Sequence, residues 1–123
     1  MNWVLDKSRP ISPQICELIC VAVASGEFSA GEKLLSVREV ALLAGVNPNT
    51  VQKSFEELER RGVIHSVRCS GWYVNENIEA ASDEVRTLRI KKTEEYITAM
   101  EQLGFSLDDI IKHFNEIREE NNE

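Results

Sequence analysis

The feature that most restricts the fold is a pair of helix starts separated by one short turn. Ser36 and Glu39 have the spacing of a capping box, in which each side chain accepts a hydrogen bond from the other residue's backbone N–H. Gly45 is suited to end that helix, and Asn47-Pro48 then supplies a second N-cap followed by proline at the first helical position. The arrangement predicts two helices joined by a tight turn, the second running to about residue 61.

The flanking segments extend this pair to a winged helix-turn-helix. Upstream, Ser12-Pro13 predicts a helix that has Ser12 as its N-cap and ends at Gly26, followed by a short strand or extended turn over residues 28–34. Downstream, residues 63–67 and 72–74 are β-prone and flank a glycine-containing loop, which predicts a two-stranded hairpin. The expected fold is therefore mostly α with a small β hairpin.

Helical periodicity gives each helix of the central pair an inner and an outer face. The inner residues are Val40, Leu43 and Ala44 in the first helix and Val51, Phe55 and Leu58 in the second. The outer face of the second helix carries Asn49, Lys53, Glu56 and Arg60, with Gln52 on its flank. Asn, Gln and Lys can read base edges, and Thr50 can hold a phosphate, although the same residues also suit a solvated helix surface.

The last part of the chain predicts two amphipathic helices. One should run from about residue 82 to 103, and after Gly104 a second should begin at Ser106, with Asp109 completing a capping box. Such a wide apolar stripe calls for a partner chain, and folding back onto the chain's own winged helix is the alternative. The candidate dimerisation residues are Val85, Leu88, Tyr96, Met100, Leu103, Leu107, Ile110, Ile111, Phe114 and Ile117. The expected domains are residues 1–76 and 77–123.

The charge balance bears on a polyanionic partner. The formal charge is −7, but residues 1–77 hold 8 Lys and Arg against 9 Asp and Glu, whereas residues 78–123 hold 6 against 12. The acid excess therefore belongs to the tail. Because salt screens charges beyond a Debye length of about 8 Å, nucleic acid responds to the local surface, and the acidic total does not exclude it.

Residues 10–74 resemble the DNA-binding domain of the GntR family of bacterial transcriptional regulators. Residues 36–41, Ser-Val-Arg-Glu-Val-Ala, resemble the family's Ser-x-Arg-Glu-Leu-Ala, and residues 45–51, Gly-Val-Asn-Pro-Asn-Thr-Val, resemble Gly-Val-Ser-Arg-Asn-Thr-Val. The sequence departs from the family at Pro48, where an arginine often stands, and at Ser12, where tyrosine is common. The 49 residues after Val74 are similar in length to the tail of the small YtrA-type subfamily.

The resemblance implies a homodimeric DNA-binding regulator that acts as a repressor on a palindromic operator, for example that of a transporter operon. It implies DNA contact by Arg38, Asn49, Thr50, Gln52 and Arg68. Together with the residues indicated by position, the candidate DNA-binding set is Ser36, Arg38, Asn47, Asn49, Thr50, Gln52, Lys53, Arg68, Ser70 and Gly71. An effector, if one exists, would act through the tail helices.

Two other functions stay open. One is a winged-helix module that binds protein, favoured by the acidic pI of about 4.9, and the other is a thiol-based redox regulator that uses Cys69. No metal ligand set, cofactor motif or catalytic constellation stands out, so neither a cofactor nor enzymatic activity is expected. The start of the sequence lacks the pattern of a secretory signal, which predicts a cytoplasmic location.

Overall fold

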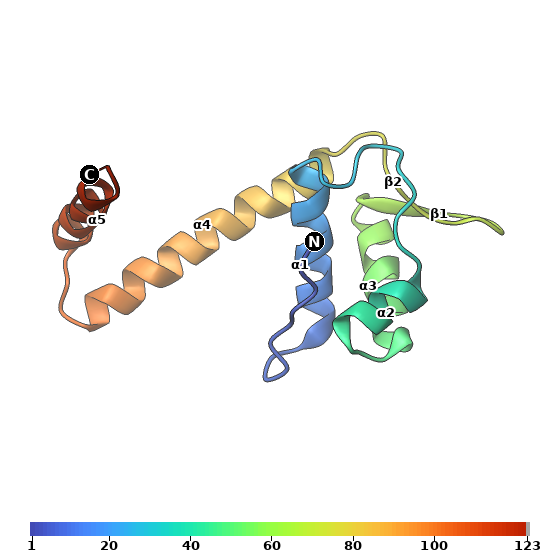
Figure 1. Cartoon of the computed structure of the whole chain (residues 1–123), viewed down its shortest axis with the longest axis horizontal. Coiled ribbons are helices and arrows are strands. Elements are labelled where there is room, and N and C mark those ends of the chain that lie inside the picture. The colour runs from blue at the N-terminus through green and yellow to red at the C-terminus, as the bar shows by residue number, and fades with distance from the viewer. Residues whose placement is uncertain (123) are drawn as a thin grey trace. The chain divides into compact units, whose positions relative to one another are not determined.

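The computed structural model describes residues 1–122 and contains five helices and one two-stranded antiparallel sheet in that range (Figure 1). The elements are α1 (Ile11–Ala24), α2 (Val37–Ala44), α3 (Pro48–Arg60), β1 (Ile64–Val67), β2 (Gly71–Val74), α4 (Glu79–Gln102) and α5 (Leu107–Asn121). The predicted fold class, a winged helix-turn-helix followed by two helices, is confirmed. The chain divides into two compact units, Met1–Arg86 and Thr87–Glu123, while the expected domain division after residue 76 stays a prediction.

The core of the first unit lies between α1, α2, α3 and the hairpin. The side chains of Ile15, Ile19, Phe55 and Leu58 are fully buried there, and the Phe55 ring meets Trp72 of β2 edge-on, with 5.5 Å between centroids. Burying such apolar surface is the main force that holds short helices together. The hairpin extends beyond the helices as a wing (Figure 1).

A third extended segment lies along β2. The backbone N–H of Leu34 donates to the Trp72 carbonyl at 2.8 Å, that of Val74 donates to the Glu32 carbonyl at 2.8 Å, and Lys33 forms a bridge with Tyr73. The short strand or extended turn expected over residues 28–34 is thus an extended segment that pairs with the wing.

The helix-turn-helix is capped as the sequence predicts. Both hydrogen bonds of the Ser36–Glu39 capping box are present, and Gly45 ends α2 in the left-handed conformation with φ of +67°. The Asn47 side chain accepts a hydrogen bond from the Asn49 N–H at 2.8 Å at the start of α3. These local contacts fix the turn between α2 and α3.

Three details of the prediction are wrong. Ser12 is not an N-cap, because α1 already begins at Ile11 and the Ser12 hydroxyl instead lies 2.8 Å from that of Ser54 on α3. Leu43 is 60% exposed, because so short a helix turns only Val40, Ala41 and Ala44 toward the core. Helix α4 begins at Glu79, three residues early, where the Asn77 side chain accepts from the Glu79 N–H at 2.8 Å.

The second unit holds the end of α4 and the whole of α5. The rings of Tyr96 and Phe114 stack with 5.7 Å between centroids, and Ile110 is buried. The capping box between Ser106 and Asp109 is present, and its hydrogen bonds lower the pKa of the Asp109 carboxyl. Among the described residues, no helix combines the length and the apolar character that crossing a bilayer requires.

Candidate nucleic-acid interface

Helix α3 presents a polar face to solvent. Asn49, Lys53 and Glu56 are exposed, and Gln52 and Thr50 are half-buried. The opposite face is held in the core by four buried residues, Val51, Ser54, Phe55 and Leu58. Because the buried face is fixed on α1 and the wing, the orientation of the polar face is fixed as well. A helix held this way suits insertion into a major groove.

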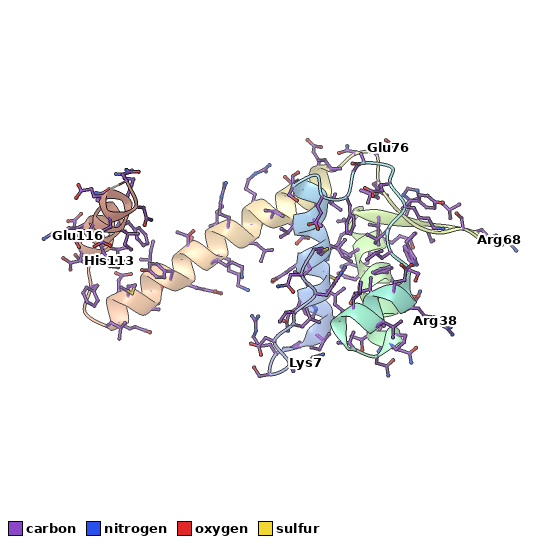
Figure 2. All side chains as sticks on the ribbon, viewed as in Figure 1. Lys7, Arg38, Arg68, Glu76, His113 and Glu116 are labelled. Atoms are coloured by element: carbon purple, nitrogen blue, oxygen red, sulfur yellow. The ribbon has the colours of Figure 1, made fainter. Side chains whose placement is uncertain are left out.

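Two arginines flank this face on neighbouring elements. Arg38 projects from α2 and Arg68 from the tip of the wing, and both side chains are exposed and point away from the core (Figure 2). The wing turn is tight: Cys69 has φ of +62°, Gly71 has φ of +134°, and the Ser70 hydroxyl lies 2.5 Å from that of Tyr73. Guanidinium groups in these places can bind phosphates or enter a narrow minor groove.

The carboxylates near α3 are engaged by other partners. Glu57 pairs with Arg60 and Arg61, and the hydrogen bonds from Arg60 first, and then from Arg61, lower the pKa of Glu57 to about 2. Glu59 accepts from the backbone N–H of Ser66 at 2.8 Å, and Glu56 accepts from Gln52 at 3.1 Å. Glu57 and Glu59 are therefore engaged by protein donors, and Lys53 on the polar face has no carboxylate partner among the described residues.

Two candidate DNA-binding residues, Ser36 and Asn47, are also the N-caps of α2 and α3. The Ser36 hydroxyl accepts from the Glu39 N–H at 3.1 Å, and Asn47 accepts from Asn49 as described above. A serine hydroxyl and an asparagine amide each keep donor hydrogens after accepting such a bond. Either side chain can therefore cap its helix and donate to a phosphate at once.

The N-terminal segment, which no motif in the sequence marks, supports the site from outside the helix-turn-helix. Trp3 is buried in the core, and the Gln14 amide donates to the Asp6 carbonyl at 2.9 Å and accepts from the Asp6 N–H at 2.8 Å. The Lys7 ammonium, at the lower end of the unit in Figure 2, donates to the carbonyls of Ala44 at 3.1 Å and Gly45 at 2.9 Å. Lys7 thus stabilises the end of α2 at the turn. No periodic or capping pattern marks these contacts.

The cysteines divide into two kinds. Cys69 is exposed at the wing, whereas Cys16 and Cys20 are buried on α1 and all three are free thiols. Burial raises the pKa of both α1 thiols, that of Cys20 to about 12. In residues 1–122, no three His, Cys, Asp or Glu side chains are grouped closely enough to hold a metal ion.

Comparison with known proteins agrees with this geometry. Residues 12–74 match the family described as bacterial regulatory proteins, gntR family, and the chain belongs to that family. It is a transcriptional regulator with a DNA-binding winged helix-turn-helix domain, and the family is one of DNA-binding regulators rather than enzymes.

Two curated relatives come from Bacillus subtilis. The chain is 31% identical to the uncharacterised HTH-type transcriptional regulator YhcF, over 91% of this chain and 93% of YhcF. It is 40% identical to the HTH-type transcriptional repressor YtrA, over 69% of this chain and 65% of YtrA.

Solved structures extend the likeness to three dimensions. A GntR family transcriptional regulator from Listeria monocytogenes superposes with a TM-score of 0.79 at 36% identity, over 91% of this chain and 98% of that one. The AraR DNA-binding domain, solved in complex with operator ORX1, superposes with a TM-score of 0.56 at 25% identity, over 58% of this chain and 93% of that one.

Proposed function

We propose that this regulator is a homodimeric repressor that binds a roughly palindromic operator through α3, α2 and the wing. The observation that carries the proposal is the exposed polar face of α3, flanked by the exposed Arg38 and Arg68, with the nearby Glu57 and Glu59 engaged by protein donors. In a two-fold dimer, the two recognition helices would enter major grooves about 34 Å apart.

The proposed contacts fall into three groups. Asn49, Gln52 and Lys53 would read base edges in the major groove, while Thr50 would hold a phosphate at the start of α3. The remaining proposed contacts are Ser36 and Arg38 at the start of α2, Asn47 at the turn, and Arg68, Ser70 and Gly71 in the wing. That AraR binds operator DNA with a similar domain supports this choice over a module that binds protein.

The apolar face of the second unit supports the homodimer. Leu103 is 71% exposed, Leu107 52% and Phe114 50%, and Ile111 and Ile117 continue the same surface along α5. Exposing so many large apolar side chains on one pair of helices is unfavourable in water. In a two-fold dimer, the same apolar face of a second copy would cover them. Ile110 is buried beneath this face, whereas Val85 packs against the core of the first unit.

Repression is proposed because a relative with 40% identity, YtrA, carries the name of a repressor. A dimer that occupies a promoter blocks polymerase without any catalytic step. A transporter operon is the target class that the similarity to the small subfamily suggests, and a small-molecule effector would act by changing the separation of the two reading heads.

DNA reading is tested by selecting bound duplexes from a random-sequence pool and measuring the affinity of the recovered duplex in a mobility shift. Arg38→Ala should weaken binding at least tenfold, because a charge-assisted contact contributes about 1.5–3 kcal/mol. Arg89→Ala, which removes an exposed arginine from α4, is the matched control and should bind like the wild type. Equal affinity of both variants, or selection of no shared sequence, would overturn the proposal.

The dimer is tested by sedimentation. Phe114→Glu places a charge in the centre of the apolar face and should produce monomers, whereas Lys92→Glu changes an exposed residue of α4 and should leave the dimer intact. The wild-type protein sedimenting as a monomer would refute the homodimer directly.

A further inference from the structure

The cations of the first unit divide into two groups by their partners. Arg9 pairs with Asp6, Arg60 and Arg61 pair with Glu57, and Arg86 pairs with Asp83. Lys7 is engaged by two backbone carbonyls. Within the described residues 1–86, the cations that have neither kind of partner are Lys33, Arg38, Lys53 and Arg68.

Three of these four belong to the proposed DNA interface, and the fourth, Lys33, lies beside it. Its backbone bridges to Tyr73 of β2, and the next residue, Leu34, is buried, so that the Lys33 side chain faces outward. The carboxylate of its neighbour in sequence, Glu32, accepts from the Ser29 N–H at 2.6 Å, and the Glu76 carboxylate lies beside Gly31.

The Lys33 side chain runs toward the turn of the wing. A Cβ atom built on Gly71 would lie 3.3 Å from Lys33 Cε and 3.9 Å from its Nζ, so the ammonium sits where Gly71 has no side chain. Gly71 pairs with Val67, the residue that precedes Arg68. The ammonium therefore lies at the base of the turn that carries Arg68 at its tip.

We propose that Lys33 is an additional DNA-binding residue, which contacts a backbone phosphate beside the groove that Arg68 enters. The wing then holds DNA with two cations, one at the tip of its turn and one at the base of that turn. A lysine ammonium is a point charge on a flexible stem, which suits a phosphate better than a base edge. This inference rests on the proposed placement of the wing on DNA.

The test is the salt dependence of affinity for the selected duplex, measured from 50 to 300 mM KCl. Each lost phosphate contact makes the negative slope of log K against log salt shallower by about 0.9. Each protomer loses one contact, and each loss lowers the affinity about eightfold at 0.1 M salt. Lys33→Gln should show this change, Lys33→Arg should keep most of the wild-type slope, and Lys92→Gln is the control without effect.

The outcomes separate this inference from the proposed function. If Arg38→Ala and Arg68→Ala weaken binding but Lys33→Gln keeps the wild-type slope, the contact by Lys33 is refuted while the interface stands. If Lys33→Gln loses affinity with an unchanged slope and a lowered melting temperature, Lys33 is only a structural residue of the wing, and the inference is likewise overturned. If none of the three variants changes binding, the proposed interface fails.

Discussion

The hydrogen-bonded pair between α1 and α3 allows a quantitative test of how the recognition helix is held. Ser54 is fully buried; its hydroxyl donates to the Thr50 carbonyl at 2.9 Å and lies 2.8 Å from the Ser12 hydroxyl. If Ser54 donates to Thr50, the Ser12 hydroxyl is the donor between the two serines. Ser54→Ala then removes both bonds and leaves the half-buried Ser12 hydroxyl without its acceptor.

The expected costs follow from this geometry. Ser54→Ala should lower the free energy of unfolding by about 1–2 kcal/mol, and Ser12→Ala by about 0.5–1 kcal/mol, because Ser54 keeps its bond to Thr50. The double variant should resemble Ser54→Ala alone, which gives a coupling of about 0.5–1 kcal/mol. Ser29→Ala, at an exposed position, is the matched control and should stay within about 0.5 kcal/mol of the wild type.

Urea unfolding followed by circular dichroism at 222 nm measures these values, at one fixed protein concentration because association also contributes to stability. Strictly additive costs for the two serines would refute the bond between the helices. Full stability of Ser12→Asp would favour an N-cap role instead, since aspartate is as good a cap as serine.

Two further predictions concern thiols and acid. A thiol reagent at pH 8 should quickly modify one cysteine per native chain, Cys69, because Cys16 and Cys20 are buried and the pKa of Cys20 is raised to about 12. Cys69→Ser should abolish the fast phase of the reaction. A second fast-reacting thiol would contradict the burial of Cys16 and Cys20 on α1. The folded pKa of Glu57, about 2, lies below its usual value of 4.5, so its pairing with Arg60 stabilises the fold above pH 4.5 and is lost as the pH falls toward 2. Melting curves of the wild type and Glu57→Gln should therefore converge over that range, and a constant difference between them would refute the assignment.

Features set by neighbouring residues could be predicted from the sequence. The capping boxes at Ser36 and Ser106 need only a partner three residues away, and both are present. The left-handed end of α2 at Gly45 and the hairpin after Gly62 are likewise local, because a few backbone angles decide them. Together these elements were sufficient to define the winged helix-turn-helix.

Features that depend on distant partners could not be predicted in the same way. Ser12 followed by proline has the pattern of an N-cap, but its hydroxyl bonds 42 positions along the chain, to Ser54. Lys7 reaches the end of α2, 37 positions away at Ala44, without any pattern in the sequence that connects them. A local motif indicates which hydrogen bonds a side chain can form, and the packing of distant elements determines which of them it forms.

The same distinction explains why an acidic chain can carry a DNA-binding surface. The net charge counts every carboxylate equally, but a carboxylate that has a protein donor as its partner differs from one that faces only solvent. Glu57 pairs with Arg60 and Arg61, and Glu59 accepts a hydrogen bond from Ser66 in β1, so these acids face protein donors. Within residues 1–86, the unpaired cations lie near α3 and the wing. Over distances below the Debye length, a polyanion meets that local surface rather than the total charge. Glu57 and Glu59 next to the recognition helix are therefore compatible with DNA binding, because the fold supplies each of them with a protein partner.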